Sequence, residues 1–165
     1  MICMKTETPN LSKNRYPKIL QVCVFALLSI GWMTFIFLSS SADGDTSSMS
    51  SDAVYYHFLN WMPYSLEVIR LIRKSAHFIA YAVLGFLYAG FFDALLRSYN
   101  KVFFVSFVLG VFYAVTDEHH QFFVPGRSPM VTDIAIDACG IAVGIALAWA
   151  VKMLVTYCYQ KIRTK

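Results

Sequence analysis

Long apolar runs separated by short polar segments make up most of this chain of 165 residues. The first run, 19–38, contains no charged residue, and about 20 residues that rise about 1.5 Å each cross a hydrocarbon core of about 30 Å. Three later runs predict further helices at about 66–96, 102–121 and 132–157. The pattern therefore predicts an all-α fold, an integral membrane bundle of four transmembrane helices.

A signal peptide is the alternative interpretation of the first run. Lys13, Arg15 and Lys18 precede the run, and the small residues 40–42 follow it and offer a cleavage site. The run is longer than the usual apolar core of a signal peptide. We therefore expect it to remain in the protein as a membrane anchor.

The longest connection between apolar runs lies between the first and the second. It begins with a Ser-rich stretch, 39–51, and ends in an aromatic segment, 54–64, whose apolar residues recur at helical spacing. Aromatic side chains favour the boundary between lipid and water, so we expect this segment to lie in the membrane interface. No Gly or Pro interrupts 65–84, and the second membrane helix is expected to begin near Leu66.

Composition agrees with a membrane protein, because 58% of the residues are hydrophobic and only 15% are charged, against about 25% in soluble domains. Basic residues near the ends of the spans then predict the orientation. Ten lie on one side: Lys5, Lys13, Arg15, Lys18, Arg97, Lys101, Lys152, Lys161, Arg163 and Lys165. The other four are Arg70, Arg73, Lys74 and Arg127. Both termini are therefore expected in the cytoplasm, and the net charge of +4 reflects this topology and gives no reason to expect nucleic acid as a partner.

Ionisable residues within membrane helices are costly and usually mark a functional site. Arg70, Lys74, His77 and Tyr81 form one stripe on the second helix, descending from the outer surface. At the other end of this helix, Asp93 is expected to pair with Arg97 at i, i+4, and Lys152 is expected to extend to the interface.

Polar residues also gather around the third and fourth helices. Asp117 and Gln121 share a helical face, and a turn over 124–129 carries Arg127. We expect Thr132 to cap the fourth helix. Further along that helix, the pair Gly140 and Gly144 should allow a neighbouring helix to approach closely. The predicted site, at the outer mouth of the bundle, comprises Lys74, His77, Asp117, Glu118, Gln121, Arg127, Asp133 and Asp137.

Three blocks of these residues resemble the VanZ-like family of membrane proteins. They are Lys74–Phe78 with Tyr81 and Leu84; Asp117–Gln121; and Pro125–Arg127 followed by Asp133 and the glycine of Ala138–Gly140. The resemblance implies one VanZ-like transmembrane domain, 19–157, between cytoplasmic tails 1–18 and 158–165, in a multi-pass protein of a bacterial cell membrane. It also implies a link to low-level resistance to teicoplanin, a lipid-tailed glycopeptide. Asp137 departs from the family pattern, which usually has Asn there.

Three functions remain open for the predicted site. Basic side chains at its mouth favour binding of an amphiphile from the membrane, either a glycopeptide antibiotic or a lipid-linked wall precursor. The carboxylates, with His77 and His119 or His120, contain the elements of a metal- or acid/base-dependent hydrolase or transferase that acts on a lipid-linked substrate. HExxH, GxSxG and Walker signatures are absent from the sequence, and no metal ligand or cofactor is assigned. A structural or scaffold role is the third.

The predicted orientation is testable with the substitution Ser47→Cys. Because residue 47 lies in the connection that we place outside, its thiol should react with a membrane-impermeant maleimide added to intact cells. The unsubstituted chain, which has four cysteines of its own, provides the background. Labelling of residue 47 only after lysis would reverse the predicted topology.

Overall fold

The computed structural model describes residues 16–96, 98–127 and 130–163, and these residues form helices joined by short loops, without a strand. The helices are α1 Tyr16–Ser40, α2 Gly44–Val54, a π-helical turn Tyr55–Leu59 (η1), α3 Leu66–Leu95, α4 Tyr99–Gln121 and α5 Val131–Arg163. Within the described residues four of them, α1, α3, α4 and α5, are long and apolar enough to cross a membrane. The predicted all-α fold with four transmembrane helices is therefore confirmed.

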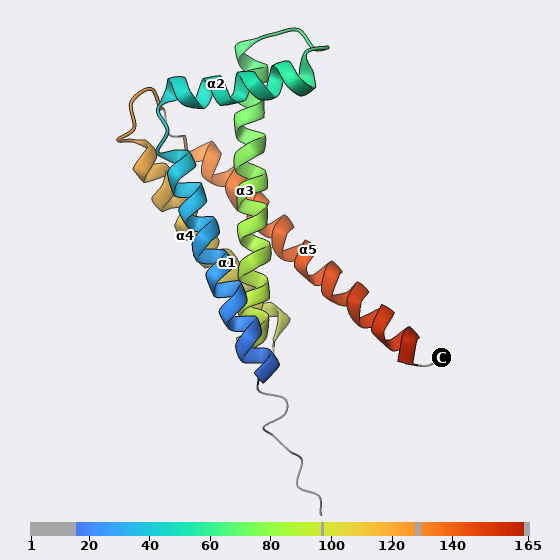
Figure 1. Cartoon of the computed structure of the whole chain (residues 1–165). Helices are drawn as coiled ribbons and strands as arrows, with labels where there is room; N and C mark the ends of the chain where they lie inside the picture. The colour runs from blue at the N-terminus through green and yellow to red at the C-terminus, as the bar shows by residue number, and fades with distance from the viewer. Residues whose placement is uncertain (1–15, 97, 128–129, 164–165) are drawn as a thin grey trace, which may run out of the picture.

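The four long helices form the bundle, and α2 lies across one end of it (Figure 1). Helix α1 begins and α5 ends toward the opposite end, and the last turns of α5 lean away from the other helices. Helix α5 continues to Arg163, into the predicted tail 158–165, whereas most of the predicted tail 1–18 lies outside the described residues.

Most of the Ser-rich stretch 39–51, which we expected to be a plain connection, belongs to helix α2. The Asp43 carboxylate caps the helix by accepting a hydrogen bond of 2.7 Å from the Thr46 amide. Ser48 and Ser51 donate their hydroxyls to backbone carbonyls one turn earlier, so these polar groups are satisfied within the helix itself. The predicted aromatic segment follows directly and begins with the π-helical turn.

Glycines bring α3 and α5 into backbone contact. A Cβ atom at Gly140 would overlap the carbonyl oxygen of Phe78, and one at Gly144 would overlap that of Ala82. The same holds in reverse for Gly85 of α3, which faces the carbonyl of Ile141. The close approach predicted at Gly140 and Gly144 is therefore confirmed, with α3 as the neighbouring helix.

Helix α1 is attached to the bundle by side chains that donate to the backbone of other helices. The Trp32 indole donates to the Ala80 carbonyl at 2.8 Å, and the Tyr113 hydroxyl donates to the Met33 carbonyl at 2.6 Å. Such bonds satisfy polar side-chain atoms that lipid cannot. The centre of the bundle, which contains Tyr81, Leu84, Ile141 and Ile145, is fully buried.

One local prediction was wrong, and another falls partly outside the described residues. Asp93 pairs with Lys152 of α5 at 2.6 Å, a partner 59 residues away, and Arg97, its predicted partner, lies outside the described residues. Helix α5 begins at Val131, so Thr132 lies in its first turn and does not cap it. The hydroxyl of Thr132 instead lies 3.4 Å from the Asp133 carboxylate.

The backbone contact predicts a large effect of one methyl group. Gly144→Ala should destabilise the bundle by about 1–3 kcal/mol, because the new Cβ overlaps a backbone atom that cannot move without shifting α3. Denaturation by SDS, followed by circular dichroism in mixed micelles, measures the change. Gly31→Ala is the matched control, since a Cβ there meets no described neighbour within 4 Å; equal stability of the two variants would contradict the packing argument.

Candidate functional site

A small polar cavity of about 20 Å³ lies where α3, α4 and α5 meet. Seven of the eight predicted site residues line it. The lining comprises Arg73, Lys74, His77, Glu118, Gln121, Arg127, Asp133, Ile136 and Asp137. Residues from three helices and one loop, up to 64 positions apart in the sequence, thus meet at one place, as the sequence analysis expected of them.

Asp117, the eighth predicted residue, is buried beside the cavity at the end of α4. Its Oδ2 atom accepts hydrogen bonds from the Ser40 hydroxyl at 2.8 Å and from the Gln121 amide at 3.2 Å. All three side chains are at least 95% buried. Ser40, the last residue of α1, was missed from the sequence, because a serine at the end of an apolar run does not reveal a partner 77 residues away.

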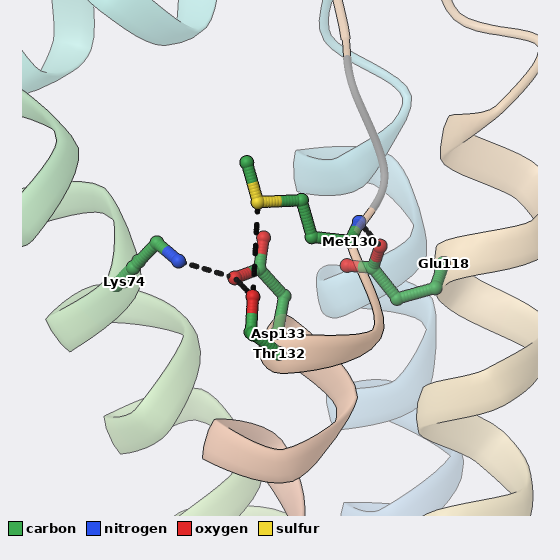
Figure 2. A network of polar contacts seen from close by, with 5 residues as sticks. All are labelled: Lys74, Glu118, Met130, Thr132 and Asp133. Atoms are coloured by element: carbon green, nitrogen blue, oxygen red, sulfur yellow. Dashed lines mark hydrogen bonds and ion pairs between the residues drawn. The ribbon is translucent and has the colours of Figure 1, made fainter.

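The start of α5 is held from two sides (Figure 2). Lys74 of α3 forms an ion pair of 2.6 Å with Asp133, and the Glu118 carboxylate of α4 accepts a hydrogen bond of 3.3 Å from the Met130 amide. The first amides of a helix have no partner within the helix, so Glu118 satisfies a donor that would otherwise be unpaired. Negative groups near this helix end also suit its dipole.

Arg127 joins the loop before α5 to the end of α1. Its Nε donates to the Ala42 carbonyl at 3.2 Å and its Nη2 to the Ser39 carbonyl at 3.4 Å. Gly126 adopts a φ of +73°, which favours glycine, and the adjacent Pro125 carbonyl accepts a hydrogen bond of 3.0 Å from the Gly44 amide. Burial, and secondarily the nearby Arg73, lower the pKa of Arg127, but a guanidinium remains charged at neutral pH.

Helix α3 contributes His77, which is partly buried and lies with its ring nearly parallel to that of Tyr81, at 6.5 Å between centroids. Arg73 also lines the cavity, although the predicted site did not include it. A sequence signal for Arg73 exists: it precedes His77 by four residues, which places both on one helical face.

The adjacent histidines of α4 lie apart. His120 contacts the Ser41 hydroxyl at 3.0 Å and stacks on Phe37, whereas His119 contacts Phe123. Among the described residues, no three His, Cys, Asp or Glu side chains are grouped closely enough to hold a metal ion.

A mostly apolar groove of about 340 Å³ adjoins the cavity. Residues of α1, α2 and α3 form its walls, with Phe35, Ile36, Val54, Ile72, Ala76 and Ala80 as the apolar part, besides Ala42 of the connection and a row of serines. Arg73, His77 and Arg127 line both the groove and the cavity. The site therefore has a charged part and an apolar part that meet at three basic side chains.

A family model described as VanZ/LLP1 matches residues 25–154, which is most of the chain. The chain belongs to the VanZ/LLP1 family. The predicted resemblance is confirmed, and the match includes all eight predicted site residues of this VanZ/LLP1 protein. No curated protein and no solved structure matches the chain.

The buried contact of Asp117 predicts unequal effects of two neighbouring serines of this VanZ/LLP1 protein. Ser40→Ala should destabilise the bundle by about 1–3 kcal/mol, because a buried carboxylate loses a hydrogen-bond donor. Ser41→Ala should cost less than about 0.5 kcal/mol, since Ser41 is exposed. Unfolding in SDS measures both changes, and a cost for Ser41→Ala that matches or exceeds that of Ser40→Ala would contradict the role given to Ser40.

Proposed function

We propose that this membrane protein binds an anionic amphiphile, with its lipid tail in the groove and its anionic group where the groove meets the mouth of the cavity. The observation that carries the proposal is the junction of the two spaces at Arg73, His77 and Arg127. Within this class we propose a lipid-tailed glycopeptide, teicoplanin, or a lipid-linked wall precursor as the ligand. Low-level protection against teicoplanin, in a bacterial cell membrane, is the corresponding cellular function.

Arg73 is the side chain best placed to hold an anionic group. Lys74 is already paired with Asp133, and Arg127 donates two hydrogen bonds to backbone carbonyls. For Arg73, by contrast, no hydrogen bond or ion pair links its guanidinium to the described residues. Its planar fork is suited to a carboxylate or phosphate, the anionic groups of the proposed ligands.

The groove supplies a place for the tail. Its walls are mostly apolar and are formed by residues of α1, α2 and α3. A lipid tail that enters it exchanges one apolar surrounding for another, so the tail adds position and selectivity more than it adds hydrophobic free energy. An anion without a tail should therefore bind at the mouth of the cavity in a less defined orientation.

The proposed orientation places this end of the bundle outside. Helix α2, whose residues help to line the groove, lies at the end of the bundle opposite to the start of α1 (Figure 1). Most basic residues near the spans belong to the other end, which the positive-inside rule assigns to the cytoplasm. A glycopeptide or a wall precursor exposed on the outer leaflet then reaches the site directly from the membrane.

Two variants test the two halves of the site. Arg73→Gln should weaken binding of teicoplanin at least about tenfold, since a hydrogen bond to a charged group contributes about 1.5–3 kcal/mol. Ala76→Trp should weaken it similarly, because the indole fills the groove. Calorimetric titration of the protein in lipid nanodiscs measures both, with a polyprenyl-linked wall precursor as the second ligand.

Each variant has a matched control. Arg163→Gln removes the same charge at the far end of α5, and Ala146→Trp adds the same bulk on an exposed face of α5. Both controls should bind as the wild type does, and cells that carry them should keep the wild-type protection against teicoplanin. Unchanged affinity of Arg73→Gln and Ala76→Trp for both ligands would refute the proposed site.

A further inference from the structure

Asp137 differs from the other acidic residues around the cavity because none of the described residues donates a hydrogen bond to it. It is 1% exposed, and both of its carboxylate oxygens are buried without a partner among the described residues. Each oxygen exposes less than 1 Å², so a water molecule in the cavity does not reach it. A buried carboxylate in this condition is far less stable than the neutral acid.

Each of the other three carboxylates accepts at least one described donor. Asp117 accepts from Ser40 and Gln121, and Glu118 accepts from the Met130 amide. Asp133 is paired with Lys74. If one carboxyl of the site carries a proton, the pattern of donors singles out Asp137.

The negative charges around Asp137 also favour its neutral acid over the carboxylate. The carboxylates near enough to influence it are those of Glu118, Asp117 and Asp133, all negative. His77 and Tyr81 face the same region from α3.

None of the described cations around the cavity forms an ion pair with the Asp137 carboxylate. Lys74 is paired with Asp133, Arg127 donates to backbone carbonyls, and Arg73 lies at the junction with the groove. Three cations and three carboxylates line the cavity, so the total charge does not decide which carboxyl group is protonated. The missing hydrogen-bond donors among the described residues single out Asp137.

We propose that Asp137 is a proton-binding site, protonated at neutral pH, at the contact of α5 with the cavity. The neutral acid removes a buried charge that has no partner among the described residues and supplies an O–H donor. That donor lies in a region where Asp117 Oδ1 and the Tyr81 hydroxyl are also buried without a partner among the described residues. The inference goes beyond amphiphile binding and does not depend on it, because it concerns the protein without any ligand.

Infrared spectroscopy of the full chain in lipid nanodiscs, without ligand, tests the proposal. A protonated carboxyl group gives a C=O stretching band that is separate from the carboxylate bands. At neutral pH the wild type should show this band, and labelling of aspartate with ¹³C at the carboxyl should shift it. Asp137→Asn should abolish the band, whereas Asp93→Asn, the same change in the exposed pair with Lys152, should keep it.

A second variant guards against misfolding of Asp137→Asn. In Asp137→Glu the protonated carboxyl group belongs to a glutamate. Its band should therefore shift with ¹³C-glutamate and no longer with ¹³C-aspartate. Absence of a protonated-carboxyl band at neutral pH in the wild type would overturn the proposal. So would a band that remains in folded Asp137→Asn, or one that keeps its aspartate label in Asp137→Glu.

Discussion

The contact between the backbones of α3 and α5 is the constraint on which the rest of the structure depends. At Gly140 and Gly144 the two helices approach so closely that a single added carbon would overlap a carbonyl oxygen. Between apolar helices in a lipid environment, close packing of this kind replaces the hydrophobic force that drives association in water. Because the contact fixes the register of the helices, Asp133 lies within reach of Lys74, and Asp137 lies against the cavity beside His77.

Polar contacts at one end of the bundle fix the positions of further helices, in addition to the glycine contacts between α3 and α5. Glu118 holds the first turn of α5, and Arg127 connects the preceding loop to the end of α1. Asp117 makes a further connection to α1 through Ser40. Hydrogen bonds between membrane helices contribute only about 0.6 kcal/mol on average, so these contacts specify the arrangement more than they stabilise it. The apolar core then carries most of the packing, and the polar end defines the site.

The sequence predicts what depends on spacing and hydropathy, and it fails where the partner lies far along the chain. The four spans and the shared face of Asp117 and Gln121 follow from runs and periods that a single segment contains. Helix α2 was missed because its composition is that of a loop, and its serines become compatible with a helix only by bonding to its own carbonyls. Asp93 was assigned its nearest basic neighbour in sequence, whereas packing of α3 on α5 offers Lys152. The roles of Ser40 and Arg73 likewise depend on neighbours that only the fold supplies.

The charge state of Asp137 connects the two proposals without making either depend on the other. An ionised Asp137 would add a negative charge in surroundings that screen it poorly, and its carboxylate would repel an anionic group. With Asp137 neutral, this repulsion is absent, and Lys74 and Arg127 remain engaged with Asp133 and with backbone carbonyls. Under the first proposal, the guanidinium of Arg73 receives the anion at the point where the cavity meets the groove. Taken together, the two proposals let a site rich in acidic residues accept an anionic ligand, because one of its carboxyl groups is protonated.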